Sequence, residues 1–501
     1  MKSKVSERCA LAALIALVVY CLACFYPVAW SPDSKKLVFP VFGEDRIAAL
    51  VMTDLSGKAI RDVARVPAGV KDTTLSPAAW SPDGKWIAYF KLTKKLQNDV
   101  ETISAELMLQ AADSGNDRLL LGFSYPKGKD ELFGSELYGP GWLGDSKTLT
   151  IESVSAGKPV VLLVGLDGKI QREIPLPADG IARQTAAVAP DGKSLAYFEQ
   201  AEEKTATLVV SDITSGKARK LAPTKVYVTP FLRPVWSADS STLLYVSMAG
   251  EDGHGQLRKI DVQTGKEKVL WQPENVVVVY GISVSAATDW IAVDRVIEPD
   301  KGQVYMTNVI NATTGEVRPV SYGSLDMNLS MSISPDGKWV AFCPSGGDKR
   351  KAPVFGVIVS NDGAQMNFFL PDPKLKEKIP KFMSNRLGAA FTASGALEQL
   401  KKDGVDAEDV KTPEQAAAVG AALDKFAAGQ TSPLFRQASA YGKVQAYFEM
   451  IRNQPAADRA KYAGEAQKII DAFLKDYPGA EPVREELKAQ LDEILPAARP
   501  S

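Results

Sequence analysis

The sequence contains little cysteine and histidine, and this scarcity excludes several kinds of function. Of the four cysteines among 501 residues, Cys9, Cys21 and Cys24 lie in one apolar N-terminal stretch, and Cys343 alone lies beyond it. A disulfide framework is therefore excluded from the rest of the chain, and Cys343 is predicted to be a small buried apolar residue. The only histidine is His254. We predict that it lies in a solvent-facing loop and not in a zinc site.

Motifs of common enzymes are missing as well. The chain has no G-x-S-x-G nucleophile elbow, and no glycine-rich phosphate loop leads into a helix. The acidic stretch from Asp403 to Asp409 lacks the ligand spacing of a calcium loop. With 59 basic and 60 acidic residues, the net charge is −1 and gives no general affinity for nucleic acid. We therefore predict no cofactor, no metal, no nucleic-acid partner and no enzymatic activity.

An uncharged stretch from Cys9 to Tyr26 follows a positively charged start. Its length lies at the border between a signal peptide and a short membrane-spanning helix. Because the positive charge precedes it, the rest of the chain is expected on the far, extracytoplasmic side of a membrane. We predict that residues 1–25 are a signal peptide or an N-terminal membrane anchor. A third alternative is a lipoprotein in which Cys24 is lipidated.

One phrase recurs along the chain in modified copies. It reads AAWSPDGKWIAYF at residues 78–90, VAWSPDSKKLVF at 28–39 and SISPDGKWVAF at 332–342. Seven copies align on it at steps of 46 to 62 residues, a spacing typical of propeller blades or similar repeats. The sixth copy has Ala287 in place of the aspartate. The aspartates of the other copies are Asp33, Asp83, Asp145, Asp191, Asp239 and Asp336.

The phrase has the composition of a β-hairpin. Proline presets its own backbone angle in a type I turn, aspartate accepts hydrogen bonds from nearby amides, and glycine adopts the positive φ that closes the turn. The tryptophan before the turn is predicted to fill the space between neighbouring sheets. We therefore predict a structural role for the repeated aspartates, as turn caps. The glycines and tryptophans of this motif are Gly84, Gly192, Gly337, Trp30, Trp80, Trp142 and Trp236.

A second hairpin follows the first, as in LVMTDLSGKAIRDV and LVVSDITSGKARKL. Two hairpins make a sheet of four antiparallel strands, which exposes an apolar face and unpaired edges. Closing several such sheets into a ring buries the faces and leaves only short edges. The sequence thus predicts a mainly β fold, a seven-bladed β-propeller of four-stranded antiparallel blades over residues 26–372.

The W-S-P-D-G-K phrase, the apolar strand after it and the D-x-x-[ST]-G-K hairpin resemble the TolB-type, WD-repeat-like propeller repeat of bacterial envelope proteins. The resemblance covers residues 26–372 and implies a propeller that works in the cell envelope. The TolB pattern that this resemblance implies is a small α/β domain followed by six blades. This chain departs from that pattern through a seventh copy and an added tail.

After residue 372 the apolar residues change from a period of two to helical spacing. The segment TPEQAAAVGAALDKFAAG begins with Thr412 as a helix N-cap and Pro413 as the first helical residue, and it ends at Gly429. Three further segments with apolar stripes follow. We predict a linker with a helical start at residues 373–411 and an α-helical bundle at 412–501. A single tetratricopeptide-like helix pair is the alternative for the last two helices.

Recognition residues tend to lie in loops on a rigid scaffold. The stretch SYPKGKDELFGSELYGPGW, residues 124–142, is longer than the repeat requires and mixes aromatic with charged residues, as protein contacts do. The alternative is that it only covers the rim of the propeller. The candidate contact residues are Tyr125, Lys127, Phe133 and Tyr138.

Together these observations predict a membrane-tethered or secreted propeller on the extracytoplasmic, periplasmic side of the cell envelope. It is expected to be a scaffold that binds envelope proteins and reaches the membrane through its N-terminal segment. Two alternatives stay open. One is an enzyme that processes carbohydrate or peptide in the central channel, and the other is a small-ligand sensor that signals through the helical tail.

Overall fold

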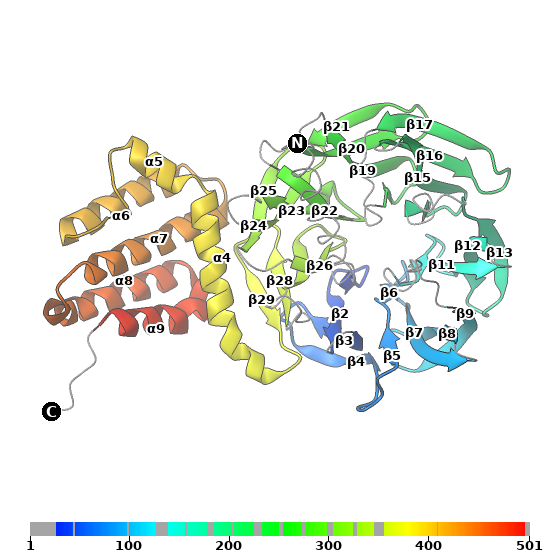
Figure 1. Cartoon of the computed structure of the whole chain (residues 1–501), viewed down its shortest axis with the longest axis horizontal. Helices are drawn as coiled ribbons and strands as arrows, with labels where there is room; N and C mark the ends of the chain where they lie inside the picture. Colours follow the sequence, from blue (N-terminus) through cyan, green and yellow to red (C-terminus); the bar gives the residue numbers. More distant parts are fainter. Residues whose placement is uncertain are drawn as a thin grey trace, which may run out of the picture.

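The computed structural model describes residues 27–43, 46–97, 100–126, 139–155, 158–177, 185–202, 205–224, 233–249, 254–272, 276–297, 304–323, 328–344, 355–407 and 409–495. Its strands form seven sheets arranged in a ring, and its helices form one group beside that ring (Figure 1). The predicted fold, a seven-bladed propeller followed by α-helices, is confirmed.

Each blade is built from strands that are consecutive in the chain. Blade 1 contains β1 (Ala29–Trp30), β2 (Lys36–Phe42), β3 (Ile47–Asp54) and β4 (Ala59–Arg65). Blade 2 contains β5 (Thr73–Leu75), β6 (Ala79–Trp80), β7 (Trp86–Gln97), β8 (Val100–Ala111) and β9 (Asp117–Pro126). Blade 3 contains β10 (Gly141–Trp142), β11 (Thr148–Ser155), β12 (Lys158–Gly165) and β13 (Ile170–Pro175).

The other four blades continue around the ring. Blade 4 contains β14 (Ala187–Val188), β15 (Ser194–Glu202), β16 (Thr205–Asp212) and β17 (Ala218–Thr224). Blade 5 contains β18 (Val235–Trp236), β19 (Thr242–Ala249), β20 (His254–Asp261) and β21 (Glu267–Trp271). Blade 6 contains β22 (Val276–Val284), β23 (Trp290–Ile297), β24 (Val304–Asn311) and β25 (Val317–Gly323). Blade 7 contains β26 (Asn328–Ile333), β27 (Trp339–Pro344), β28 (Gly356–Ser360) and β29 (Met366–Phe369).

Blade 2 differs from the others because its first strand is interrupted. Both β5 and β6 pair with β7, and Ser76, Pro77 and Ala78 lie between them. Ser76 N donates to Phe90 O (2.9 Å), and Phe90 N donates to Ser76 Oγ (2.8 Å). Proline has no amide hydrogen to give to the ladder, which explains the break. The blade therefore has five strands where four are expected.

The two ends of the ring differ. Because every blade is an antiparallel meander, its first and third connections lie at one end, and its second connection and the link to the next blade lie at the other. We name the first the turn end, since it carries the repeated aspartate turns. We name the second the loop end, since it carries connections of variable length, such as residues 43–46, 98–99 and 345–355.

The helical part begins directly after β29. Its elements are η3 (Pro373–Lys378), α4 (Ile379–Ala393), α5 (Ala396–Lys402), α6 (Pro413–Ala428), α7 (Pro433–Arg452), η4 (Ala456–Tyr462), α8 (Ala463–Asp476), η5 (Pro478–Val483) and α9 (Arg484–Ile494). At α6, Thr412 caps the helix and exchanges hydrogen bonds with Gln415 in a capping box, and Gly429 is the C-cap. None of the helices in the described ranges is both long and apolar enough to span a bilayer.

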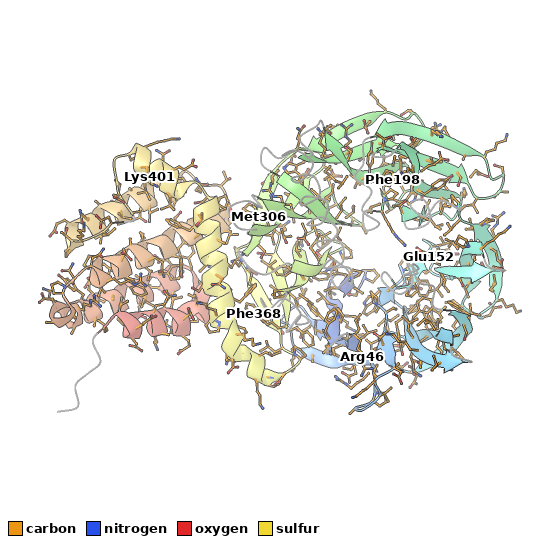
Figure 2. The ribbon with its side chains drawn as sticks, viewed as in Figure 1. Arg46, Glu152, Phe198, Met306, Phe368 and Lys401 are labelled. Atoms are coloured by element: carbon orange, nitrogen blue, oxygen red, sulfur yellow. The ribbon has the colours of Figure 1, made fainter. Side chains whose placement is uncertain are left out.

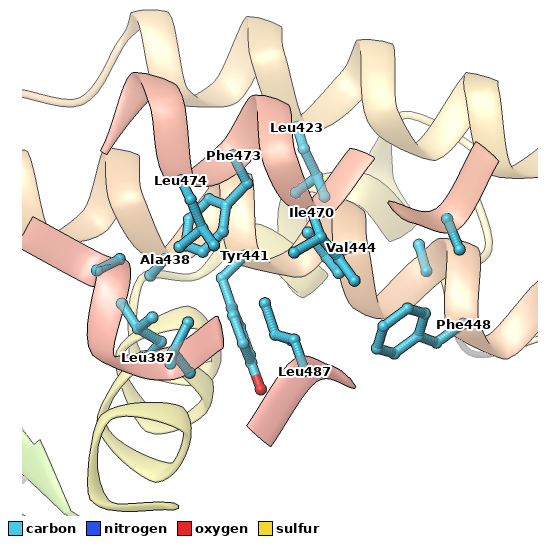
Figure 3. Close-up of a cluster of buried hydrophobic side chains, with 14 of the residues drawn as sticks. Leu387, Leu423, Ala438, Tyr441, Val444, Phe448, Ile470, Phe473, Leu474 and Leu487 are labelled. Carbon is cyan, nitrogen blue, oxygen red and sulfur yellow. The ribbon is translucent and has the colours of Figure 1, made fainter. Parts of the chain in front are cut away.

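The helices share one apolar core, in which Leu387, Tyr441, Phe473 and Leu487 meet from α4, α7, α8 and α9 (Figure 3). Helix α4 also lies along blades 6 and 7 (Figure 1), and Phe382 on α4 packs with apolar residues of blade 7. The helical domain is thus attached to the outside of the ring by packing as well as by the chain.

Candidate functional site

The repeated aspartates accept hydrogen bonds inside their own turns. Asp83 Oδ1 accepts from Ser81 Oγ (2.7 Å) and from Lys85 N (3.1 Å). A hydrogen bond from Ser237 is the largest cause that lowers the pKa of Asp239 to about 2. These oxygens are therefore engaged in folding the turn. In the other copies too, the backbone N–H two residues after the aspartate donates to its Oδ1, at 2.8 to 3.1 Å. These aspartates are Asp33, Asp145, Asp191, Asp239 and Asp336.

Neighbouring turns bind each other through the residue after the aspartate. In three blades this residue is a serine with positive φ, and its hydroxyl accepts the aspartate amide of the preceding blade. The φ angles are 61° for Ser34, 57° for Ser146 and 61° for Ser240. The bonds are Asp336 N to Ser34 Oγ (3.0 Å), Asp83 N to Ser146 Oγ (3.0 Å) and Asp191 N to Ser240 Oγ (3.1 Å). Serine and glycine alternate here from blade 1 to blade 5, a pattern that sequence reasoning missed.

Gly84, Gly192 and Gly337 occupy the same position in blades 2, 4 and 7, and each has a positive φ. A Cβ at Gly337 would lie 2.3 Å from Thr288 Oγ1 in blade 6, so this site requires glycine. The turn of blade 6, without its aspartate, binds blade 7 differently. Ser285 Oγ (2.6 Å) and Ala287 N (3.0 Å) both donate to Pro335 O.

The tryptophans of the motif lie beside the junctions between blades. Three of their indole nitrogens donate to a backbone carbonyl of the preceding blade. These bonds run from Trp30 to Ser332 O (3.3 Å), from Trp142 to Ala79 O (3.2 Å) and from Trp236 to Ala187 O (2.9 Å). The indole nitrogen of Trp80 is buried without a partner among the described residues. The motif thus supplies both turn caps and links between blades.

A cavity of about 280 Å³ opens at the turn end, among the aspartate turns of blades 3, 4 and 5. Asp145, Asp191 and Asp239 line it, together with Leu143 and Pro190. Within the described ranges, no group of three or more His, Cys, Asp or Glu side chains is placed to hold a metal ion.

A second charged feature joins two blades that are not neighbours. Arg233, just before β18 of blade 5, forms an ion pair with Glu152 on β11 of blade 3. The side chains are only 20% and 14% exposed, and Figure 2 places Glu152 toward the inner side of blade 3. A pair this well shielded from water interacts strongly and costs desolvation energy. Sequence reasoning missed this pair, because Arg233 and Glu152 belong to different copies of the repeat.

Arginines on the outermost strands form a further set of links that sequence reasoning missed. Arg61 Nη1 donates to Gln110 Oε1 (2.6 Å) in the next blade, and its Nη2 donates to Ala112 O (3.1 Å). The sequence feature that could have indicated these links is an arginine three or four residues after the glycine of the second hairpin. The others contact Leu166 O, Thr214 Oγ1, Val262 O and Asn361 Oδ1, from Arg118, Arg172, Arg219 and Arg318 respectively.

The predicted contact loop is described only at its start. Tyr125 lies in β9, where it pairs with Ile103 of β8. Lys127, Phe133 and Tyr138 lie outside the described residues, as does Cys24. His254 is the first residue of β20, a strand where a loop was predicted. Cys343 is 2% exposed in the core between blades 7 and 1, and burial raises the pKa of its thiol.

Comparison with known proteins gives limited similarity. No protein-family model matches the chain. The uncharacterized peptidase YuxL of Bacillus subtilis is 26% identical over 153 residues, which are 30% of this chain and 20% of that protein. The chain therefore spans about a fifth of the length of this curated relative.

Solved structures with similar folds include TolB from Acinetobacter baumannii, with a TM-score of 0.37 and 17% identity over 57% of this chain and 63% of that one. A prolyl endopeptidase has a TM-score of 0.46 and 13% identity over 72% of this chain and 53% of that one. These likenesses concern the fold. The predicted propeller is confirmed by its seven sheets, and TolB structures are among the solved structures of similar fold.

The prediction that the protein is not an enzyme is contradicted by the comparison with YuxL. That prediction was based on the absence of known enzyme motifs from this chain. The relative that matches part of the chain is named as a peptidase. A missing nucleophile elbow excludes one arrangement of catalytic residues and not catalysis as such. An enzymatic activity is therefore compatible with this chain.

Proposed function

We propose that this protein binds a protein partner in the cell envelope with the loop end of its propeller. In this proposal residues 1–25 direct or tether it to the extracytoplasmic side, and residues 26–372 form the binding scaffold. The candidate contact residues are those predicted from the sequence, Tyr125, Lys127, Phe133 and Tyr138.

The observation that carries this proposal is the difference between the two ends of the ring. At the turn end the connections are short, and turn residues such as Asp83 and Ser146 bind one another. At the loop end the connections differ in length from blade to blade, and β7 and β8 extend over 12 residues each. Loops of variable length on a rigid scaffold are the usual location of recognition.

Two exposed aliphatic residues allow a matched test. Leu96, near the loop end of β7, is 74% exposed, and Ile170, beside a turn at the turn end, is 46% exposed. We expect Leu96→Asp to reduce capture of a cross-linked envelope partner by the full chain at least fivefold, and Ile170→Asp to leave it unchanged. Loss of capture by Ile170→Asp alone, or no specific partner for the unaltered chain, would contradict the proposal.

A second candidate function is the processing of peptides, and the partial identity to a peptidase supports it. The partly buried pair of Arg233 and Glu152 is the charged feature on which a peptide terminus would bind. Purified full chain is incubated with a peptide library, and products are measured by mass spectrometry. If peptides are cleaved, Arg233→Ala should abolish turnover. Lys91→Ala, which breaks an exposed ion pair with Glu106 (3.1 Å), should not.

A further inference from the structure

The ring has one junction that the chain does not span. Every other pair of neighbouring blades is joined by the segment that leaves the last strand of one blade and enters the first strand of the next. Blade 7 and blade 1 are joined by no such segment, and within the described ranges no strand of either sheet pairs with the other. We name the contacts between these two blades the closing interface. Among the described residues, side-chain hydrogen bonds and close packing hold this interface together.

Hydrogen bonds at the closing interface connect residues that are far apart in sequence. Near the ring centre, Ser332 Oγ donates to Val28 O (2.7 Å). Farther out, Asn367 Nδ2 on β29 donates to Leu55 O of blade 1 (2.8 Å). The apolar part includes Phe39 and Phe369, whose rings stack with centroids 5.2 Å apart.

The fit across this interface depends on the position of β29. A Cβ at Gly57 of blade 1 would lie 2.2 Å from Phe368 O, so the two backbones approach as closely as glycine permits. The other side of Phe368 contacts the helical domain. Its ring meets Phe382 of α4 edge to face, with centroids 6.2 Å apart. Phe382 also meets Phe355 of blade 7 at 5.4 Å.

Arg386, one turn farther along α4, connects the last two blades. Its Nη2 donates to Val320 O of blade 6 (3.0 Å) and to Gly363 O of blade 7 (2.7 Å). The side chain is 1% exposed, and burial lowers its pKa to about 10. A buried guanidinium that bonds two carbonyls fixes both of them, because moving either carbonyl leaves a buried donor unsatisfied.

We propose that the helical domain controls the closing interface: by holding β29 and the last two blades through Phe382 and Arg386, it keeps the ring shut. When the helical domain loosens, blade 7 moves and the ring opens at this junction before it opens elsewhere. A partner or ligand that shifts α4 can therefore change access to the centre of the ring.

Cys343 provides a natural reporter. Its thiol lies in the apolar cluster of the closing interface, so a thiol reagent reaches it only after opening. The test uses the full chain with Cys9, Cys21 and Cys24 replaced by serine. The labelling rate is measured by mass spectrometry under native conditions. The matched reporter combines Cys343→Val with Val246→Cys, because Val246 is 3% exposed in the corresponding cluster between blades 5 and 6.

We expect Phe382→Ala to speed labelling at residue 343 at least tenfold and to change labelling at residue 246 less than twofold. Arg386→Gln should do the same to a smaller extent, and it replaces Phe382→Ala if that variant does not fold. Equal acceleration at both reporters would indicate general destabilisation and overturn the proposal. Unchanged labelling at residue 343 in a folded variant would overturn it as well.

Discussion

Asp294 is predicted to lower the stability of the protein as the pH rises. It lies on β23, facing blade 7, and is 2% exposed. Its Oδ1 accepts a hydrogen bond from Thr307 Oγ1. Its Oδ2 lies against the backbone of Gly281, 3.5 Å from the position that a Cβ would occupy there. Burial raises the pKa of Asp294 to about 8, and no charged neighbour among the described residues contributes to the shift. An ionised carboxylate at this place is therefore poorly compensated.

The sign and size of the effect follow from linkage. An unfolded aspartate titrates near pH 4, whereas Asp294 in the folded protein titrates at about 8. Between these values unfolding releases a proton, so the free energy of unfolding falls by about 1.4 kcal/mol for each pH unit. The loss reaches roughly 5 kcal/mol near pH 8 and does not grow above it. Asn has nearly the same shape and no charge, so Asp294→Asn removes this loss.

The assay is urea unfolding of the full chain and of Asp294→Asn at pH 5.5, 7 and 9. We expect the gain from the substitution to increase by about 3 kcal/mol from pH 5.5 to pH 9. Asp239→Asn is the control. The pKa of Asp239 is lowered to about 2, chiefly by its bond from Ser237, so that variant should lose stability equally at all three pH values. An Asp294→Asn gain that is independent of pH would refute the reasoning.

Two further predictions concern single contacts. Ser146→Ala should destabilise the protein by about 1 kcal/mol, because Asp83 N loses its acceptor while the left-handed backbone keeps its strain. Ser146→Gly should lose less stability than Ser146→Ala, measured by thermal denaturation, since glycine removes that strain. Thr412→Ala should cost about 1 kcal/mol through loss of the α6 capping box, measured as the free energy of unfolding in urea. An unchanged transition in either alanine variant would contradict its prediction.

Features that depend on neighbouring residues could be predicted from the sequence. The repeat predicted seven blades because each copy encodes its own hairpins, and the letters Thr412-Pro413 predicted the start of α6 because capping is a local interaction. The turn of the sixth copy lacks proline, aspartate and glycine together, and its residues bind Pro335 of the next blade.

Features that join separate blades could not be predicted in the same way. The alternation of serine and glycine is visible in the sequence, yet its meaning requires knowing that Ser146 Oγ lies 3.0 Å from the amide of Asp83. The pair of Arg233 and Glu152 requires still more, because it skips a blade. In each case the contact depends on how the sheets are packed around the ring.

Arg386 shows why the attachment of the helical domain to the ring could not be predicted from the sequence. On a helix, an arginine is normally read as part of the solvent-facing side. Here the outermost strand β25 has a register shift between its pairings with Asn308 and Thr307, and Val320 falls in that shift. Its carbonyl accepts from Arg386, and the carbonyl of Gly363 accepts from the same nitrogen. A polar edge of the ring therefore requires a buried donor from outside the ring, and the helix that supplies it becomes part of the propeller's own stability.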